Sequence, residues 1–307
     1  MTRHLLRDDD LSPAEQAAIL DRAERMKADR FAERPLEGPQ TVAVIFDKSS
    51  TRTRVSFAVG IADLGGVPLV ISTASSQLGG KETASDTARV LERQVAAIAW
   101  RTYAQSGLEE MAAGTTVPVV NALSDDFHPC QLLADLLTIR EHKGALQGLT
   151  VAFVGDGGDN MVHSYLLACA TAGIHLRVAH PASYGPRREI VEDAIRIAAS
   201  TGGSITLLSD PAEAMADADV VVTDTWVSMG REDQKAARLE AFAGYQVTRE
   251  LMTKAKGDAI FLHCLPADRG FEVEAEVIDG PQSVIWDEAE NRLHAQKALL
   301  AWLLEQD

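Results

Sequence analysis

The stretch that decides the fold consists of TVAVIF (residues 41–46), DKSSTRTR (47–54) and VSFAVGIAD (55–63). The first part is a short apolar run, which favours a buried strand, and the last part has the apolar spacing of a helix. The polar part therefore lies where a helix begins. Helix N-termini carry unpaired N–H groups and the positive end of the helix dipole, so hydroxyl and guanidinium donors at this turn suit a phosphate. The alternative interpretation is a Ser/Thr N-cap followed by solvated arginines.

The same alternation of short apolar runs and helical patterns continues along the chain. It predicts an α/β fold in which parallel sheets are flanked by helices. The expected strands are 41–46, 67–71, 95–100, 117–121, 149–154, 174–179, 204–208, 219–223 and 258–263.

We expect two domains, because a helix over about 131–142 is followed by a Lys-Gly pair and a new strand. The first domain would span residues 1–140 and the second residues 141–307, each with a central parallel sheet. A last helix over about 289–305, rich in Leu and Ala, closes the chain.

The composition is that of an ordinary folded protein without a surface devoted to nucleic acid. Of the 307 residues, 46% are hydrophobic and 24% are charged. Lys and Arg number 29 and Asp and Glu number 45, so the formal net charge is 29 − 45 = −16. This excess of negative charge argues against DNA, RNA or an anionic membrane as a partner. A small anionic substrate must therefore be held by local basic groups.

The cysteines and the N-terminus indicate a cytoplasmic protein. Cys130, Cys169 and Cys264 include no close pair and no metal-type spacing, so we expect reduced thiols and not disulfides. Residues 1–10 contain no apolar signal core, and no segment of the sequence reads as a membrane span.

Polar side chains follow two further predicted strands of the first domain. Arg101 ends the strand at 95–100, and His-Pro-Cys-Gln (128–131) lies where a helix begins. Open α/β folds bind ligands at the carboxyl edge of a parallel sheet. Arg and His donors at successive strand ends would converge there with the turn at 50–53. Taken alone, the tetrapeptide is equally well a polar helix start with a proline turn.

In the second domain, the run at 155–160 follows a strand in the manner of a dinucleotide-binding turn, but Asn160 occupies the position of the third glycine. The next strand ends without the acidic residue that holds a ribose, which disfavours a nicotinamide cofactor. Asn160 can instead direct its amide at a small polar substrate. Asp224, after the strand at 219–223, suits a substrate amine. Cys264 is favoured for binding over covalent catalysis, because the sequence offers no definite base partner.

These motifs together resemble the aspartate/ornithine carbamoyltransferase family, and its ornithine-specific branch most closely. The match runs nearly the whole chain, in the family's order. Its elements are Ser50-Thr51-Arg52-Thr53-Arg54, the Gln77–Lys81 loop, Arg101, His128-Pro129-Cys130-Gln131, Asp224, Ser228-Met229-Gly230 and His263-Cys264-Leu265-Pro266. The Ser-Met-Gly and His-Cys-Leu-Pro motifs are those that favour ornithine over aspartate.

The resemblance implies a carbamoyl phosphate-binding first domain and an ornithine-binding second domain, with the last helix crossing back to the first. The residues implied for carbamoyl phosphate are Ser50, Thr51, Arg52, Thr53, Gln77, Arg101, His128, Gln131, Cys264, Leu265 and Arg292, the last at the start of the final helix. Those implied for ornithine are Asn160, Asp224, Ser228 and Met229. The implied catalytic residues are Arg101, His128, Asp224 and Cys264.

The implied reaction transfers the carbamoyl group of carbamoyl phosphate to the δ-amine of L-ornithine and yields L-citrulline and phosphate, in arginine biosynthesis. No metal or organic cofactor is implied. The resemblance also implies a cytoplasmic homotrimer, which gives the Gln77–Lys81 loop a role near a neighbouring subunit. Arg54 lies two helical positions past Arg52, so we expect it to point elsewhere and to have a structural role.

Several alternatives stay open from the residues. Transcarbamoylases that act on putrescine, an acylated ornithine or aspartate share the phosphate half and differ in the second-domain loop. The direction of flux, towards arginine synthesis or citrulline breakdown, is also open. A non-catalytic sensor or regulatory subunit on the same fold is disfavoured, because Arg52, Arg101, His128 and Asp224 occur together. An NAD-dependent dehydrogenase is a third alternative.

Overall fold

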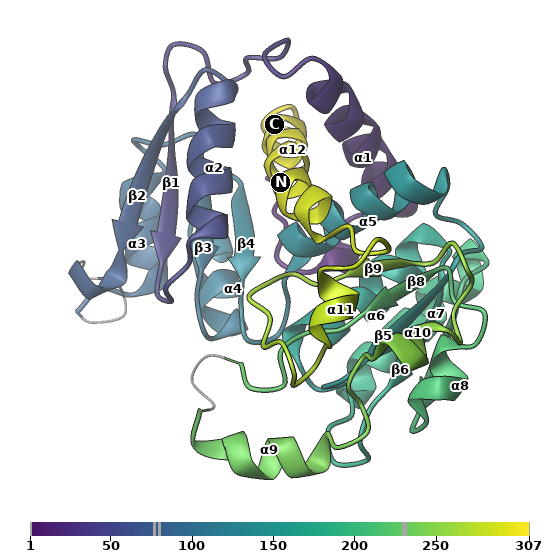
Figure 1. Cartoon of the computed structure of the whole chain (residues 1–307). Helices are drawn as coiled ribbons and strands as arrows, with labels where there is room; N and C mark the ends of the chain where they lie inside the picture. The colour runs from purple at the N-terminus through teal and green to yellow at the C-terminus, as the bar shows by residue number, and fades with distance from the viewer. Residues whose placement is uncertain (1, 76–77, 79–80, 229–231, 307) are drawn as a thin grey trace. The chain divides into compact units, whose positions relative to one another are not determined.

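The computed structural model describes residues 2–75, 78, 81–228 and 232–306. The chain forms two compact units: the first contains Met1–Leu137 and Ala289–Asp307, and the second contains Thr138–Glu288. Each unit has its own parallel sheet flanked by helices, as predicted (Figure 1).

The sheet of the first unit has the strand order β2-β1-β3-β4, and all its pairs are parallel. Its strands are β1 (Thr41–Phe46), β2 (Val67–Ser72), β3 (Ala97–Arg101) and β4 (Val119–Leu123). The chain leaves β1 towards one side of the sheet and later returns to β3 on its other side. Ligands are therefore expected beyond the carboxyl ends of β1 and β3, where the strand order reverses.

Helices cover both faces of this sheet. They are α1 (Pro13–Ala28), α2 (Arg52–Asp63), α3 (Ala84–Leu91), α4 (Gln105–Ala113) and the first part of α5 (Pro129–Lys143), with the short 3-10 turns η1 (Asp8–Asp10) and η2 (Thr73–Ser75). Leu108 and Met111 of α4 pack with Ile98 and Trp100 of β3 in one hydrophobic cluster. This core holds the ends of β1 and β3 in fixed register.

The last helix, α12 (Ile285–Leu304), packs on the first unit, as predicted. Gly60 of α2 allows a close approach, because a Cβ at this position would lie 3.1 Å from Lys297 and 3.3 Å from Leu293 (Figure 1, α12 in yellow beside α2). Lys297 is fully buried; its ammonium group donates to the carbonyl oxygen of Arg30 and lies 3.3 Å from Asp63. Because a buried charge needs such partners, these contacts fix the position of α12.

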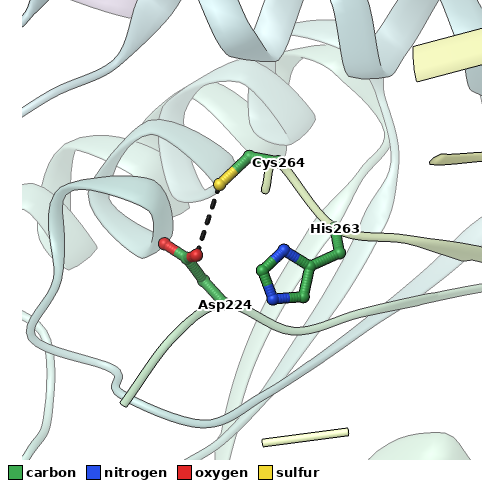
Figure 2. Close-up of side chains that lie close together, drawn as sticks. All are labelled: Asp224, His263 and Cys264. Atoms are coloured by element: carbon green, nitrogen blue, oxygen red, sulfur yellow. Dashed lines mark hydrogen bonds between the residues drawn. The ribbon is translucent and has the colours of Figure 1, made fainter. Parts of the chain in front are cut away.

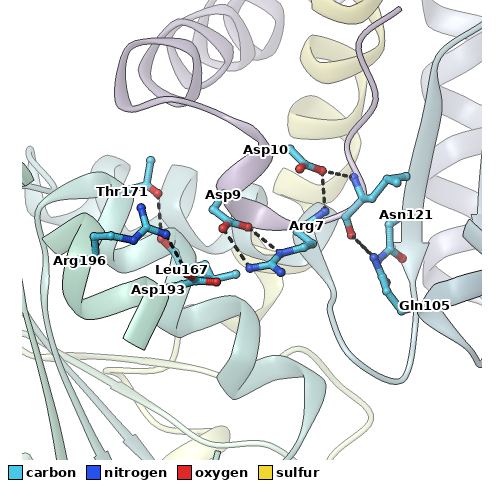
Figure 3. Close-up of polar contacts among 10 residues, drawn as sticks. Arg7, Asp9, Asp10, Gln105, Asn121, Leu167, Thr171, Asp193 and Arg196 are labelled. Carbon is cyan, nitrogen blue, oxygen red and sulfur yellow. Dashed lines mark hydrogen bonds and ion pairs between the residues drawn. The ribbon is translucent and has the colours of Figure 1, made fainter. Parts of the chain in front are cut away.

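The N-terminal segment lies along β4. Leu5 forms a parallel bridge with Val120. The carbonyl oxygen of Leu6 accepts hydrogen bonds from Gln105 at 3.2 Å and Asn121 at 2.9 Å (Figure 3). This edge of the sheet is therefore covered, whereas β2 at the opposite edge leaves apolar side chains exposed.

The sheet of the second unit has the order β7-β6-β5-β8-β9 and is also parallel throughout. Its strands are β5 (Thr150–Val154), β6 (His175–Ala179), β7 (Ser204–Leu208), β8 (Val220–Val222) and β9 (Ile260–Leu262). Here the strand order reverses between β5 and β8, so the loops after these two strands are the expected ligand-binding loops.

The helices of the second unit are α6 (Asn160–Ala172), α7 (Arg188–Thr201), α8 (Pro211–Met215), α9 (Lys235–Ala241), α10 (Arg249–Met252) and α11 (Ala275–Ile278), with the 3-10 turn η3 (Glu232–Gln234). α6 is buried almost throughout, whereas α7 buries Ile190, Ala194 and Ala198. On the exposed side of α7, Arg196 donates to Asp193 at 2.8 Å (Figure 3). Because α6 is buried almost throughout, its first turn has a rigid position beside the end of β5.

The predicted strands are confirmed, with ends that differ by two residues or fewer. The start of α5 at Pro129 also lies within two residues of the predicted one, and the fixed φ of proline suits the first helical position. Two other helix starts were wrong. α2 begins at Arg52 and not at residue 55, so the donor motif forms the first turn itself. α12 begins at Ile285 because Asp287 and Glu288 complement the dipole of its first turn, so Arg292 lies well inside the helix. Within the described part of the chain, every helix is too short or too polar to cross a membrane.

Candidate active site

The turn after β1 presents the N-terminus of α2. Thr51 is the N-cap residue, but its hydroxyl makes no capping hydrogen bond to the described first turn. Thr51 is therefore the N-cap by position but does not cap the helix through its hydroxyl, and the amides of the first turn keep the capacity to bind an anion. Arg52 is half-buried at the first helical position, and Thr53 is buried behind it. Ser50 precedes them in the same turn.

A buried chain of hydrogen bonds links three predicted residues of the first unit. Arg292 donates to Thr53 Oγ1 at 2.7 Å and to Gln131 Oε1 at 2.6 Å, and Gln131 Nε2 donates to Asp135 Oδ1 at 2.8 Å. A hydroxyl has one proton, and Thr53 uses its oxygen to accept from Arg292. Its proton is therefore left to donate to a ligand oxygen. Arg292 acts here by orienting Thr53 and Gln131.

Arg101 and His128 share a cationic environment. Arg101 is the buried last residue of β3, and His128 is buried directly before α5. Burial lowers the pKa of His128 well below its usual value, and the charges of Arg292, Arg101 and Lys48 lower it further. His128 is thus a neutral imidazole at physiological pH and offers one N–H donor. Because His128 is neutral, the charge of this cluster comes from Arg101, Arg292 and Lys48, and it favours the binding of an anion.

Lys48 is a member of this cluster that sequence reasoning missed. Lys48 lies in the sequence between β1 and the Ser-Thr-Arg motif, and its half-buried side chain pairs with Asp125 and lies 4.5 Å from the ring centre of Tyr103. The sequence feature that could have identified it is its position in the same polar turn as Ser50.

Cys130 does not contribute to the chemistry of this cluster. Burial raises the pKa of its thiol to about 12, and Sγ donates to the carbonyl oxygen of Asn121 at 3.3 Å. A thiol in this state is not a nucleophile. Cys130 therefore packs the start of α5 against β4.

Two of the predicted site residues, Gln77 and Met229, lie outside the described residues. Beside Gln77, Leu78 is buried and forms a bridge with Glu82. Ser228, the neighbour of Met229, is half-buried at the end of the loop that follows β8.

In the second unit, Asp224 and Cys264 are in direct contact. Cys264 Sγ donates to Asp224 Oδ1 at 3.2 Å, and the amide of Thr225 donates to the same oxygen at 2.7 Å (Figure 2). The pKa of Asp224 is raised to about 7, mainly by burial; Asp159 also raises it, whereas His263 and the two hydrogen bonds lower it. Asp224 therefore changes its charge near neutral pH.

His263 orients the turn that contains Cys264 and Leu265. Its Nδ1 accepts the amide of Leu265 at 2.9 Å, so the ring proton lies on Nε2, which pairs with Glu272 at 3.2 Å. Leu265 adopts a left-handed φ of 58°, a conformation that needs such support in a non-glycine residue.

Ligand atoms of Asp224, His263 and Cys264 lie within 4.8 Å of one another, which raises the question of a metal ion (Figure 2). Both ring nitrogens of His263 already make hydrogen bonds. A metal ion would have to displace one of them, and a structural zinc site needs four ligands. The geometry fits a hydrogen-bonded turn better than a metal centre.

The loops after β5 and β8 are joined by charged and polar contacts. Ser228 donates to Asp159 Oδ2 at 2.5 Å. Arg238 of α9 donates to Asp156 at 2.6 Å and to the carbonyl oxygen of Trp226 at 2.9 Å. Sequence reasoning missed Asp156, Asp159 and Arg238, because no local pattern distinguishes them from solvated charges. Asn160, predicted to bind substrate, is the first residue of α6 beside this junction.

Comparison with protein families identifies both parts of the chain. Residues 3–141 match the carbamoyl-P binding domain of aspartate/ornithine carbamoyltransferases, and residues 147–303 match their Asp/Orn binding domain. The chain belongs to the aspartate/ornithine carbamoyltransferase family.

Individual members of the family match over their full length. The ornithine carbamoyltransferase of Clavibacter sepedonicus is 78% identical over 100% of both chains. That of Renibacterium salmoninarum is 61% identical over 99% of both chains. Among solved structures, the ornithine carbamoyltransferase of Pyrococcus furiosus has a TM-score of 0.95 at 47% identity, covering 100% of this chain and 98% of its own. The anabolic ornithine carbamoyltransferase of Campylobacter jejuni has a TM-score of 0.94 at 40% identity, covering 99% and 100%.

Proposed function

We propose that this protein transfers the carbamoyl group of carbamoyl phosphate to the δ-amine of L-ornithine, giving L-citrulline and phosphate. The observation behind the proposal is the opposite charge of the two clusters. In the first unit, Arg101, Arg292 and Lys48 surround a neutral His128. In the second, Asp159 lies close enough to Asp224 to raise its pKa. A phosphate dianion suits the first cluster and a substrate ammonium group suits the second. The family relatives named ornithine carbamoyltransferase support the same choice.

We assign carbamoyl phosphate to the first unit. The phosphate is bound by the N-terminus of α2 and by Arg101, and the carbonyl oxygen is bound by Arg101, His128 and the Thr53 hydroxyl. The Arg292 contacts at 2.7 and 2.6 Å support this assignment, because they direct Thr53 and Gln131 towards one ligand. The proposed residues are Ser50, Thr51, Arg52, Thr53, Gln77, Arg101, His128, Gln131 and Arg292. Cys264 and Leu265 stay predicted contacts of the reacting group.

We assign ornithine to the second unit, with Asn160, Asp224, Ser228 and Met229 as its binding residues. The contact of 3.2 Å between Asp224 and Cys264 and that of 2.5 Å between Ser228 and Asp159 support one polar site at the ends of β5, β8 and β9. Its carboxylates favour a diamine over aspartate, which brings a second negative charge.

The reaction follows from these groups. The δ-amine of free ornithine is cationic at neutral pH, so it loses a proton before its lone pair attacks the carbamoyl carbon. A C–N bond forms, the C–O bond to phosphate breaks with its electron pair, and the phosphate takes a proton from the attacking nitrogen. Negative charge develops on the carbonyl oxygen, where Arg101, neutral His128 and Thr53 are donors. One such donor is worth about 3–4 kcal/mol. The chemistry requires no metal or organic cofactor.

The test of the function is citrulline formation from carbamoyl phosphate with ornithine, putrescine and aspartate in parallel. We expect a specificity constant for ornithine about tenfold to a hundredfold above the other two, because each unpaired or repelled charge costs roughly 1.5–3 kcal/mol. A preference for putrescine or aspartate would replace ornithine as the substrate, and turnover of none of them would favour a non-catalytic sensor.

Ornithine-site affinity should depend on pH through Asp224. Its pKa of about 7 means that the carboxyl is mostly protonated at pH 6 and mostly ionised at pH 8. Only the ionised form attracts an ammonium group, so affinity rises with pH. L-norvaline, which is ornithine without the δ-amine, isolates this effect. We expect its inhibition constant against ornithine to fall about tenfold from pH 6 to pH 8. An Asp224→Asn variant should bind norvaline weakly and with no pH dependence; a flat wild-type profile would contradict the assignment.

Cys264 should be dispensable as a nucleophile. A Cys264→Ser variant keeps a donor for Asp224 in place of the thiol that now bonds at 3.2 Å, so we expect kcat within about tenfold of wild type. A covalent mechanism predicts a loss nearer ~10⁶-fold. Mass spectrometry of enzyme quenched during turnover provides the second readout, and a carbamoylated Cys264 would overturn the direct transfer.

We further propose a cytoplasmic homotrimer that works in arginine biosynthesis. The edge strand β2 supports an interface, because Val67, Leu69 and Val70 are 45%, 44% and 38% exposed there. The anabolic relative from Campylobacter jejuni supports the biosynthetic direction. Light scattering of the purified protein tests the trimer, and arginine auxotrophy after deletion of the gene tests the direction.

A further inference from the structure

Asp159 makes an unusual contact for a residue at the start of a helix. It is the N-cap residue of α6, yet its carboxylate makes no capping hydrogen bond in the described structure. Asp210, at the N-cap of α8, shows the ordinary behaviour and accepts the amide of Ala212 at 2.8 Å. Asp159 instead accepts the hydroxyl proton of Ser228 at 2.5 Å. Because Ser228 follows β8 and Asp159 follows β5, this bond joins the two loops where the strand order reverses.

The direction of this hydrogen bond decides what Ser228 can bind. A serine hydroxyl has one proton and two acceptor lone pairs, and an ionised carboxylate can only accept. When Ser228 donates its proton to Asp159, its remaining capacity is to accept. An acceptor oxygen binds an ammonium group and repels a carboxylate.

The site also contains further negative charge. Asp159 raises the pKa values of both Asp156 and Asp224, whose largest shift in each case comes from burial. Asp156 is neutralised by Arg238 at 2.6 Å. Asp159 therefore leaves negative charge beside the Ser228 oxygen, and Asp224 lies close enough to Asp159 to feel its charge. This charge favours a cation on that side of the substrate.

We propose that Asp159 sets the specificity of the Ser228 subsite: by holding the hydroxyl as an acceptor, it makes the subsite take the α-ammonium group of the amino acid and not a carboxylate. The α-ammonium is the group concerned because the δ-amine must be neutral to attack. The inference rests on the proposed function for the identity of the amino acid. Asp159 is a specificity residue that acts through Ser228.

The test replaces the carboxylate by a group of the same shape. In Asp159→Asn the side chain can donate to Ser228, which frees the hydroxyl proton. Two ligands are compared by calorimetry with carbamoyl phosphate present: L-norvaline, and pentanoate, which has the same chain and carboxylate but no ammonium group. Neither has a δ-amine, so no turnover occurs. We expect norvaline to bind about tenfold to a hundredfold more weakly to the variant. Pentanoate should bind within about twofold of wild type, or more tightly.

The controls separate this role from a structural one. Asp210→Asn removes an N-cap charge of the same unit and should change neither affinity. In a Ser228→Ala background, Asp159→Asn should weaken norvaline binding much less than it does in the wild type, because only the direct effect of its charge then remains and the effect through the hydroxyl is lost. An equal loss of affinity for norvaline and pentanoate would overturn the proposal, because it would show that Asp159 only holds the two loops together. An unchanged affinity for norvaline would also overturn it.

Failure of the proposed function is visible separately. If the wild-type protein forms no citrulline but Asp159→Asn still loses its preference for norvaline over pentanoate, the subsite inference stands and the proposed reaction falls. If citrulline forms and the preference is unchanged, the reverse holds.

Discussion

Replacing Arg52 by alanine is expected to abolish carbamoyl phosphate binding, whereas Arg54→Ala should leave it within about twofold of wild type. Both arginines belong to the first turn of α2, but two positions correspond to about 200° around a helix. Arg52 is half-buried beside Thr53. Arg54 is exposed, and its guanidinium lies 4.9 Å from the ring centre of Phe46, in agreement with its predicted structural role. The comparison of the two variants therefore tests the position of the arginine in the turn, because both variants lose the same residue type and the same charge.

Arg52→Ala removes the guanidinium group that we propose to bind the phosphate at a helix N-terminus, where an unpaired anion is costly. We expect the dissociation constant for carbamoyl phosphate to rise by about a hundredfold or more. Protection of the wild type and both variants against thermal unfolding by carbamoyl phosphate measures this directly. Equal loss in Arg52→Ala and Arg54→Ala would point to a general effect of charge on the protein, and full protection of Arg52→Ala would remove the phosphate assignment.

Replacing Arg101 by alanine is expected to lower kcat by at least about 10³-fold. Arg101 ends β3 beside neutral His128, and it is assigned to both the phosphate and the carbonyl oxygen. An oxyanion donor alone is worth about 10²–10³ in rate, and loss of the phosphate contact adds to it. KM for ornithine should change little, because Arg101 belongs to the other unit.

Arg101→Lys is the matched variant for this prediction. It keeps the charge but not the planar fork that binds two oxygens at once. We expect it to recover part of the affinity for carbamoyl phosphate and little of kcat. Steady-state kinetics with both substrates measures the affinity for carbamoyl phosphate and kcat separately. Recovery of kcat by lysine would show that charge alone suffices, and an unchanged kcat in Arg101→Ala would exclude a role in the transition state.

The strands were predictable because their apolar runs are short, and those at the centre of each sheet are buried on both faces. β1 and β3 are buried along almost their whole length, so no other element type suits their residues. The helix starts were less predictable. The first turn of α2 consists of Thr and Arg residues that are equally common in polar turns, and its start at Arg52 depends on how the preceding strand ends.

The candidate residues were predictable where they end strands. Arg101 ends a buried strand of the first sheet and Asp224 follows a buried strand of the second, and each sheet brings the ends of its own strands together. The contacts between them were not predictable, because they join distant parts of the chain. Arg292 and Thr53 are 239 positions apart, and Arg292 and Gln131 are 161 apart. Local patterns contain no information on such pairs.

The role of Asp159 could not be predicted from the sequence for a different reason. Its place at the start of a helix predicts a cap, and the residue before a buried helix needs no other explanation. Its contact with Ser228, 69 positions away, depends on the order of β5 and β8 in the sheet. Fold topology therefore had to be known before this residue could be assigned a role.

The most direct test of the account follows the carbamoyl carbon itself. Carbamoyl phosphate labelled with ¹³C is mixed with ornithine and the protein, and the label is observed by NMR while phosphate is measured in parallel. We expect the label to move to the ureido carbon of citrulline in step with phosphate release, and Arg101→Ala to suppress both. Phosphate release without labelled citrulline, or label transfer that needs no ornithine, would contradict the proposed carbamoyl transfer.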